Sequence, residues 1–415
     1  MSTRNRIVLE AELLAPLVLK GNRQSQRSDC LDCIPGTTLR GALAGAYLRF
    51  GGTPAEAAFR RLFLDAQQAR WATLRTGLHV PPLTAASCKR SPGFSGQDEH
   101  GVVDLLVAVL RAPEGEGREE CPRPGCGQPL KPFGKAYDRT STGPKSTSAP
   151  KATAMHVGID RDTGAARHSI FFSEEAIADF SSEEAIAGDA GDAGAPSRQP
   201  TPTRIVLRGV VELGDAARAD FDALLGDLGG IVRIGRSRSR GRGKVCLKLR
   251  ETLAAPSAAD YEATARDLAA AARRSGERVL TLGFPNGAIL VDEVLRFAND
   301  PAVSIPWLPA LDRWDSPPDR IRPLYARTRL QLVRGWNVAH QLPRQDDMGI
   351  LSGSVFAYTV PAAQWPGIAA ELVALAEHGV GLRREEGFGT VSICDRFHLD
   401  AAIPAAPGSH PGGAR

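Results

Sequence analysis

The stretch RIGRSRSRGRGKV at residues 233–245 combines side chains that bind phosphate with a backbone that lets phosphate approach. Six of its thirteen residues are basic and three are glycine. Guanidinium groups form bidentate hydrogen bonds with phosphate oxygens, and glycines leave backbone amides uncovered. A P-loop would instead have the spacing GxxxxGK[ST]. The stretch therefore predicts a contact with nucleic acid.

Cysteine and histidine side chains form a second set, with metal-binding chemistry. Cys121 and Cys126 are separated by four residues that include Pro and Gly, so two thiolates can reach one ion. Cys88 and His100 supply a second pair. Together they predict a closed structural zinc site of three thiolates and one imidazole, in a segment rich in Pro, Gly and Cys.

Two other cysteines compete for this site. Cys30 and Cys33 have two residues between them and could replace the second pair in an all-thiolate site. The alternative is that these thiols are small loop residues without a ligand. The sequence contains seven cysteines, which indicates reduced thiols or metal ligands rather than a disulfide framework. We expect Cys246 and Cys394 to be core residues because they lie in apolar strands.

The basic stretch has a counterpart near the C-terminus. IGRSRSRGRGKV aligns without a gap with VGLRREEGFGTV at residues 380–391, and three glycines coincide. Each copy follows a predicted amphipathic helix and precedes an apolar run, so one supersecondary unit occurs twice. The second copy carries Glu385 and Glu386 and is less suited to phosphate. Its glycines are equally consistent with a structural turn.

The elements around these motifs predict an α+β protein with tandem ferredoxin-like (RRM-like) domains, because each copy follows strand, helix, glycine-rich turn, strand. We place the first domain at residues 1–251, with a zinc-knuckle insertion at 80–137 and a low-complexity acidic linker without a site at 173–202. The second domain covers 252–400, and 401–415 is predicted to be a disordered tail.

Three local features complete the prediction. Pro35 and Gly36 form a turn, after which Thr37 or Thr38 caps a helix. Residues 138–155 have the composition of a mobile loop. The stretch HVGIDRDTGAARHSIFF that follows predicts a β-hairpin.

Composition excludes several classes of protein. The chain has 415 residues, of which 42% are hydrophobic and 24% charged, as in ordinary globular proteins. A net charge of +4 is too small for a polycation, so what matters is the clustering of basic residues. There is no run of about 18 apolar residues and no signal-peptide pattern, so we expect no membrane association and a cytoplasmic location.

The order of several motifs along the chain resembles a known family. IPGTTLRGAL, the hairpin HVGIDRDTGAA and the C-terminal GLRREEGFGTV resemble the RAMP superfamily of CRISPR-associated proteins. With PPLTAASCKRSPGF, DEHGVVDLL and CPRPGCGQPL, they are most similar to the RAMP protein of type III-D systems, the Csx-ten family. The resemblance implies RRM-like ferredoxin folds with glycine-rich loops, and it favours the zinc ligands Cys88, His100, Cys121 and Cys126.

The resemblance also implies a role in antiviral defence. It implies an RNA-binding subunit of an effector ribonucleoprotein that holds the CRISPR guide RNA (crRNA) and caps its 5′ repeat-derived handle. Its partners would be the large polymerase-like subunit, backbone RAMP subunits and complementary target RNA. The residues implied or predicted to contact RNA are Thr37, Thr38, Arg40, His156, Asp160, Arg161, Arg236, Arg238, Arg240, Arg242, Lys244, Arg383 and Arg384.

Two further functions compete with this one. Some relatives carry an acidic residue in the loop before the IPG turn, which makes Asp29 and Asp32 candidates for RNA cleavage. His156, His168 or His340 could process a guide precursor as general acid or base. We expect a structural RNA-binding subunit rather than an endoribonuclease. A protein-interaction scaffold, whose basic loop docks an acidic partner, is an alternative of another class.

Overall fold

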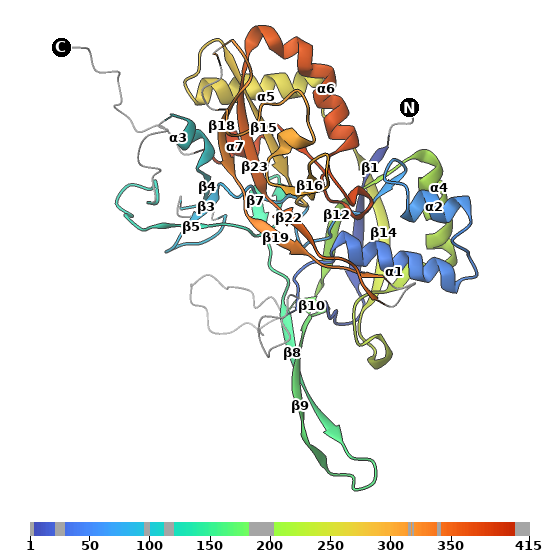
Figure 1. Ribbon diagram of the computed structural model, residues 1–415. Coiled ribbons are helices and arrows are strands. Elements are labelled where there is room, and N and C mark those ends of the chain that lie inside the picture. The colour runs from blue at the N-terminus through green and yellow to red at the C-terminus, as the bar shows by residue number, and fades with distance from the viewer. Residues whose placement is uncertain are drawn as a thin grey trace, which may run out of the picture. The chain divides into compact units, whose positions relative to one another are not determined.

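The structure is a computed structural model that describes residues 4–20, 30–94, 100–111, 120–181, 203–313, 317, 319–337 and 342–402 (Figure 1). The chain divides into two compact units. Unit 1 consists of Met1–Leu78 and Thr147–Leu253, and unit 2 of His79–Ser146 and Ala254–Arg415. Both units combine helices with antiparallel sheets, so the predicted α+β class is confirmed.

Unit 1 is built on a five-stranded sheet in which every pair of neighbours is antiparallel. The central strand β1 pairs with β12 on one side and β14 on the other, with Ala11 opposite Leu207 and Leu247. The strand order is β13 (Ile231–Arg233), β14 (Lys244–Leu253), β1 (Asn5–Leu13), β12 (Val206–Leu213) and β2 (Ala69–Arg70).

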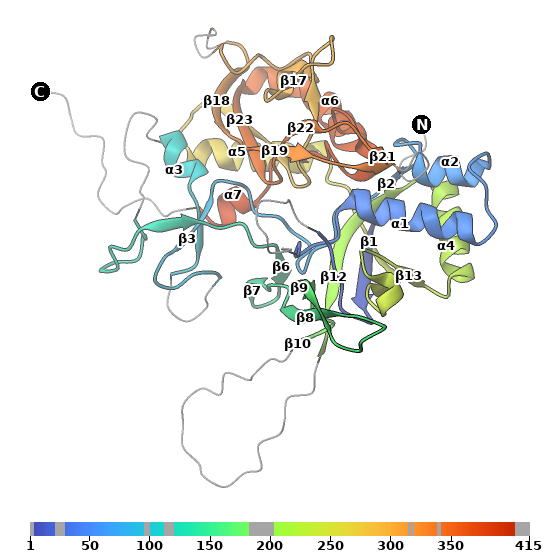
Figure 2. The ribbon, with the colours of Figure 1, turned by 60° about the horizontal axis from the view of Figure 1, so that its bottom comes forward.

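One face of this sheet carries the core of unit 1. Ile7, Leu9, Ala11 and Leu13 alternate along β1 and are fully buried, as the period of two in a strand requires. They belong to one hydrophobic cluster with side chains of the helices α1 (Gly36–Arg49), α2 (Ala57–Phe63) and α4 (Asp215–Asp227) (Figure 2). Each large side chain buried there contributes about 1.5–3 kcal/mol.

The start of α1 differs from the prediction. Its N-cap is Pro35, and no side chain caps this helix end in the described structure. Thr37 and Thr38 lie inside the first turn, where Thr38 N donates to Pro35 O. Pro35 has no N–H to donate and its φ of −58° suits entry into a helix, so the helix begins at Gly36, two residues earlier than a Thr37 cap would allow.

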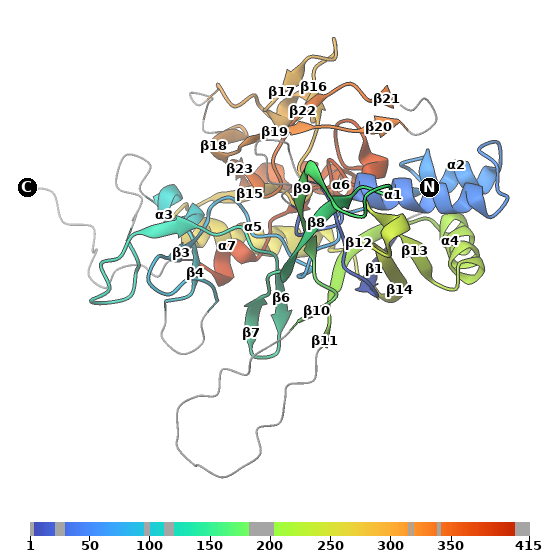
Figure 3. The same ribbon diagram turned by 90° about the horizontal axis from the view of Figure 1, so that it is seen from below.

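A long β-hairpin extends from unit 1 (Figure 1). β8 (Lys151–Ile159) pairs with β9 (Ala166–Ile177), which confirms the predicted hairpin. The hairpin begins earlier than predicted, and the predicted mobile loop 138–155 contains strands, because backbone pairing outweighs the polar composition. In the sequence, short strand pairs precede and follow it (Figure 3): β6 (Tyr137–Thr140) with β7 (Gly143–Ser146), assigned to unit 2, and β10 (Phe180–Ser181) with β11 (Thr203–Arg204) in unit 1.

Unit 2 contains a four-stranded antiparallel sheet. Its order is β18 (Arg322–Arg327), β23 (Ser354–Pro361), β15 (Glu277–Phe284) and β24 (Ser392–Ile393). The helices α5 (Ala258–Ala271) and α6 (Trp365–His378) share its hydrophobic cluster. Shorter pairs are β16 (Leu290–Val291) with β17 (Phe297–Ala298), β19 (Leu330–Val333) with β22 (Asp347–Ile350), and β20 (Trp336–Asn337) with β21 (Leu342–Pro343).

The cysteine-rich insertion groups with unit 2, whereas the sequence prediction attached residues 80–137 to the first domain. Its three-stranded sheet has the order β4 (Val102–Asp104), β3 (Ala85–Cys88), β5 (Leu130–Pro132). Phe133 and Tyr137 share a hydrophobic cluster with Phe397, which lies in the C-terminal helix α7 (Phe397–Asp400). The helix α3 (Leu106–Arg111) packs with α5 residues in another cluster. The insertion therefore belongs to unit 2 because it packs with residues far from it in the sequence.

The two glycine-rich turns have the same backbone conformation, which confirms the internal repeat. Each contains one turn of 3₁₀ helix, η1 (Arg238–Arg240) or η4 (Arg384–Glu386). In each, the amide of the third glycine donates to the segment after the first strand of the sheet: Gly243 N to Pro16 O and Gly389 N to Gly287 O. Corresponding positive φ values are 82° and 74° at Gly235 and Gly381, 55° and 56° at Ser237 and Arg383, 82° and 88° at Gly241 and Gly387, and 70° at both Gly243 and Gly389.

Within the described part of the chain, no helix is both long and apolar enough to cross a membrane.

Gly243 and Gly241 allow a test of the turn. Both have positive φ, but a Cβ at Gly243 would overlap the carbonyl oxygen of Ile234, whereas one at Gly241 meets nothing within 4 Å. We expect Gly241→Ala to lower the free energy of unfolding by about 1 kcal/mol and Gly243→Ala by about 3 kcal/mol or more. Urea unfolding of both variants measures the difference, and equal losses would contradict a steric role for Gly243.

A buried ion pair in unit 2 gives a pH-dependent prediction. His398 in α7 bonds to Asp104 at the end of β4, and both side chains are almost fully buried. Burial alone would lower the pKa of His398, but the charge and hydrogen bond of Asp104, with the charge of Asp395, raise it. A raised folded-state pKa stabilises below the unfolded value of about 6.5, and this contribution is lost as pH rises through the folded pKa.

We therefore expect His398→Gln to cost about 3 kcal/mol or more at pH 6, because Asp104 stays buried without its cation. The difference from the unsubstituted protein should shrink as pH rises above the folded pKa. Urea unfolding across the pH range measures it. A difference that stays constant with pH would show that the imidazole is not charged in the folded protein.

Candidate functional site

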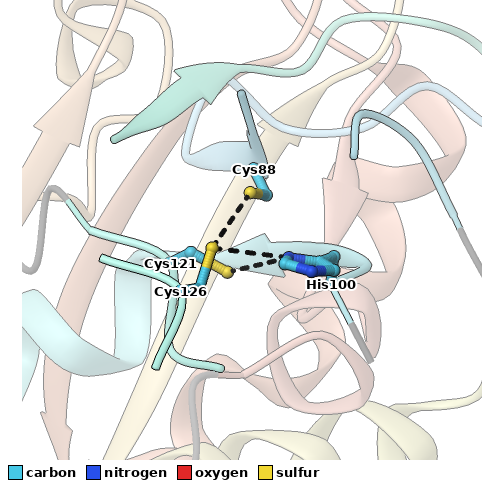
Figure 4. A group of neighbouring side chains, drawn as sticks. All are labelled: Cys88, His100, Cys121 and Cys126. Atoms are coloured by element: carbon cyan, nitrogen blue, oxygen red, sulfur yellow. Dashed lines mark hydrogen bonds between the residues drawn. The ribbon is translucent and has the colours of Figure 1, made fainter. Parts of the chain in front are cut away.

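The four predicted metal ligands come together at one end of the β4-β3-β5 sheet (Figure 4). Cys88 is the last residue of β3, His100 shortly precedes β4, and Cys126 shortly precedes β5. Both outer strands run antiparallel to β3, so the end of β3 lies beside their beginnings. The pairing of three short strands is therefore what assembles the cluster.

The spacing of the ligand atoms matches a tetrahedral ion. Cys88 Sγ lies 3.8 Å from Cys126 Sγ, and His100 Nδ1 lies 3.5 Å from Cys121 Sγ and 3.7 Å from Cys126 Sγ. All four ligand atoms lie within 4.8 Å of one another. Zinc bonds of about 2.3 Å to sulfur and 2.0–2.1 Å to nitrogen require S···S separations of about 3.8 Å and S···N separations of about 3.6 Å. The cluster could thus hold a metal such as zinc.

The loop between Cys121 and Cys126 is a tight knuckle. Cys121 N donates to Gln128 O at 2.8 Å, and Cys126 N donates to Arg123 O at 3.1 Å. Gly125 and Gly127 have φ of 75° and 55°, which glycine adopts without strain. The loop thus holds both thiols on the same side.

The thiols of the cluster shift one another's pKa in opposite directions: burial and the neighbouring thiols raise the pKa of Cys121 to about 11. Burial of the Cys88 thiol would raise its pKa, but the backbone amides of Ser91 and Arg90 and the neighbouring thiols lower it to about 6. A thiolate is the form that binds metal. The competing pair does not join this group: Cys30 Sγ donates to Leu17 O and accepts from Leu19 N, within unit 1.

The basic turn of unit 1 borders a cavity of about 330 Å³. Arg236 and Arg240 are exposed side chains on its wall. The turn is fixed against the segment after β1, because Arg236 N donates to Val18 O at 3.0 Å. Two acidic residues of β9 also line the cavity. The lining residues are Val18, Lys20, Glu174, Glu175, Arg236, Ser237, Ser239 and Arg240.

Glu174 ties the basic turn to the hairpin. Its carboxylate accepts from Ser237 Oγ at 2.6 Å and lies 3.9 Å from Arg242 Nε and 3.7 Å from His156 Nε2. The imidazole of His156 also stacks on Phe172, with ring centroids 5.1 Å apart. Arg242 therefore faces the protein, whereas Arg238 is exposed to solvent and Lys244 is half-buried at the start of β14.

Sequence reasoning missed Glu174 and Glu175. It assigned residues 173–202 to a linker without a site because EEAIA occurs twice there. In the structure, residues 173–177 complete β9, and residues 182–202 lie outside the described residues. The alternation in IFFSEEAI was the signal that could have extended the strand.

Other predicted RNA contacts are distributed around unit 1. Arg40 Nε donates to Phe63 O at 2.6 Å, so its guanidinium is engaged with α2. Asp160 accepts from the amides of Asp162 and Thr163 and closes the hairpin turn, which lowers its pKa. Arg161 is exposed at this turn.

The second turn pairs its predicted RNA-binding residue Arg383 within the protein. Arg383 is buried, with Nη2 2.6 Å from Glu386 Oε2 and Nη1 3.1 Å from Asp347 Oδ2. Arg344 Nη1 also bonds to Glu386, at 2.7 Å. Arg384 is half-buried and donates to His378 O. These contacts favour a structural role for this copy.

The catalytic candidates do not assemble into a site in the described residues. Asp32 is exposed, and Asp29 and His340 lie outside the described residues, as does the side chain of His168. Of the predicted core cysteines, Cys394 is buried and Cys246 half-buried.

Comparison with known proteins decides the family. A family model described as the RAMP superfamily matches residues 10–246, more than half of the chain. The chain belongs to the RAMP superfamily. A search of curated proteins gives no match. The match in this RAMP protein spans most of unit 1, from β1 to the basic turn.

Solved structures similar to this RAMP protein include two chains from type III-B Cmr-beta cryo-EM structures. One, bound to cognate target RNA and AMPPnP, has 14% identity and a TM-score of 0.40. The other, bound to cognate target RNA, has 12% identity and a TM-score of 0.40; both alignments cover 84% of this chain and 86% of the other. A chain of a Cas6 product complex has 17% identity and a TM-score of 0.27, covering 47% of this chain and 81% of the other.

The cluster geometry predicts about one zinc ion per chain. We expect Cys121→Ser and Cys88→Ser to lose the metal and to lower the thermal stability of unit 2, because a structural zinc site contributes folding free energy. Cys246→Ser is the matched control, since this cysteine lies in unit 1 outside the cluster. Elemental analysis of the purified proteins measures the content. Zinc that persists in Cys121→Ser would contradict the site.

Proposed function

We propose that this chain is an RNA-binding subunit of a CRISPR effector ribonucleoprotein and that its basic turn holds the guide RNA. One observation carries the proposal. Two turns share a backbone conformation, but only the first presents exposed arginines, at Arg236, Arg238 and Arg240. Since the second turn forms with its charges paired internally, the fold itself does not require those exposed cations. Membership of the RAMP superfamily supports the same role.

The sheet orders support tandem ferredoxin-like domains. Such a βαββαβ domain places its strands in the order 4-1-3-2. In unit 1, the strands β1, β2, β12 and β14 follow one another along the chain and lie in the sheet in the order β14-β1-β12-β2. In unit 2, the strands β15, β18, β23 and β24 lie in the order β24-β15-β23-β18. Both orders match 4-1-3-2. Unit 2 departs in one respect, because α5 precedes β15 instead of following it. In unit 1, β13 is an additional edge strand.

We further propose the finer role that the motif order implies. The chain would act in the cytoplasm as the type III-D, Csx-ten-like subunit that caps the 5′ handle of the guide. It would lie next to the large polymerase-like subunit, with backbone subunits and complementary target RNA as further partners. The three-thiolate, one-imidazole cluster would hold zinc as a structural ion for the small sheet β4-β3-β5, which has few core residues of its own.

Replacement of Arg236 and Arg240 by alanine tests the role of the turn. We expect the double variant to bind single-stranded repeat RNA at least about tenfold more weakly at low salt. The slope of log affinity against log salt concentration should fall by the amount that corresponds to about 1–2 phosphate contacts. Fluorescence anisotropy at several salt concentrations measures both quantities.

The matched control removes the same charge from exposed arginines of unit 2. Arg266 and Arg296 have side chains 63% and 79% exposed and lie outside the turn. If both double variants bind RNA equally well, the turn is not the RNA site. If the variant without Arg236 and Arg240 binds RNA normally but loses a contact with another subunit, the result would instead support the protein-interaction scaffold.

A further inference from the structure

We propose that the cavity beside the basic turn takes one nucleotide of the RNA, with Arg236 and Arg240 on its phosphate and Glu175 accepting a hydrogen bond from its base or ribose. This inference rests on the proposed function and goes beyond it by giving the turn a means of selecting its ligand. The shared chemistry is a phosphate joined to a hydrogen-bond donor. That donor is either an exocyclic amino group or the ribose 2′-hydroxyl.

The cavity has walls of opposite charge. Arg236 and Arg240 line it from the basic turn, and Glu174 and Glu175 line it from β9. A carboxylate is an acceptor and repels phosphate, so a purely anionic group cannot satisfy both walls. A nucleotide can, because it carries hydrogen-bond donors on its base and ribose as well as a phosphate. The volume of about 330 Å³ lies at the lower end of the range for small-molecule sites and fits one nucleotide.

The two carboxylates have different roles. Glu174 is committed to the protein: one oxygen accepts from Ser237, and the other is buried near Arg242 and His156. It therefore positions the turn. Glu175 has a side chain 30% exposed, and its Oε1 makes no hydrogen bond within the described part of the chain. This oxygen is the acceptor that remains for a ligand.

Glu175 is held in place before any ligand arrives. Its Oε2 accepts from Cys30 N at 2.8 Å and from Lys151 Nζ at 3.2 Å. The backbone amide of Cys30, with a smaller contribution from Lys151, lowers the pKa of this carboxyl, so it is ionised at neutral pH. An oriented, charged acceptor discriminates between a donor and an acceptor on the ligand more strongly than a mobile one does.

Glu175→Gln in the full chain tests the inference. The amide oxygen can still accept from Cys30 N and Lys151 Nζ, so the NH₂ group replaces Oε1 and turns an acceptor into a donor. Cytosine presents an amino group where uracil presents a carbonyl oxygen, and the two bases otherwise have the same shape. Fluorescence anisotropy at neutral pH measures the affinity for length-matched oligo(rC), oligo(rU) and oligo(dC). Comparison of these three affinities distinguishes an amino donor from a 2′-hydroxyl donor.

An amino donor predicts that the protein binds oligo(rC) about tenfold more tightly than oligo(rU), and a 2′-hydroxyl donor predicts a similar preference for oligo(rC) over oligo(dC). Glu175→Gln should abolish whichever preference exists. Glu293→Gln makes the same change at an exposed residue of unit 2 and should leave it intact.

The inference is overturned if the unsubstituted protein binds all three oligonucleotides equally, or if the preference survives in Glu175→Gln. These results are separable from failure of the proposed function. If Arg236 and Arg240 are needed for RNA binding but the preferences do not depend on Glu175, the inference alone is wrong. If the two arginines are not needed, the proposed function is wrong as well.

Discussion

The fold around both basic and acidic turns depends on one steric constraint, the contact of a glycine Cα with a carbonyl oxygen. Gly243 lies against Ile234 O, and Gly389 lies against Val380 O, so closely that neither position has room for a Cβ. This contact lets the chain return on itself within one turn of 3₁₀ helix and lets the amide of the same glycine reach the segment after the first strand. The side chains between these residues can therefore differ, since the same backbone conformation forms with both sequences.

The two turns share a backbone conformation but carry side chains of different charge. In unit 2, Glu386 is buried between Arg383 and Arg344, and Arg383 also pairs with Asp347, so two carboxylates balance two guanidinium groups. Desolvation of these buried charges offsets much of their electrostatic attraction. In unit 1, Glu174 lies outside the turn, on the hairpin, and engages Ser237 and Arg242 from there. The remaining arginines stay exposed to solvent.

What the sequence predicted well was local. The repeat and the four metal ligands were predictable because glycine spacing and cysteine spacing reflect short-range geometry, which the chain carries with it. The assignment of the insertion was not predictable, since it depends on Phe133 and Tyr137 packing with Phe397 far along the chain. Glu174 and Glu175 were missed because a repeated acidic pattern hid the end of a strand. The cap of α1 was misplaced because a threonine is a good cap in general, but Pro35 already occupies that position here.

The buried pair of Asp104 and His398 has a consequence for synthesis of the protein. The two residues are 294 positions apart, and all of residues 147–253 belong to the other unit. At about 5–20 residues per second, a ribosome needs roughly 15–60 s between them. During that interval the insertion has neither its histidine partner nor the aromatic cluster around Phe397, although its four metal ligands are already made. Metal binding to the proposed site would thus be a stabilising step that this segment can complete while the chain is still growing.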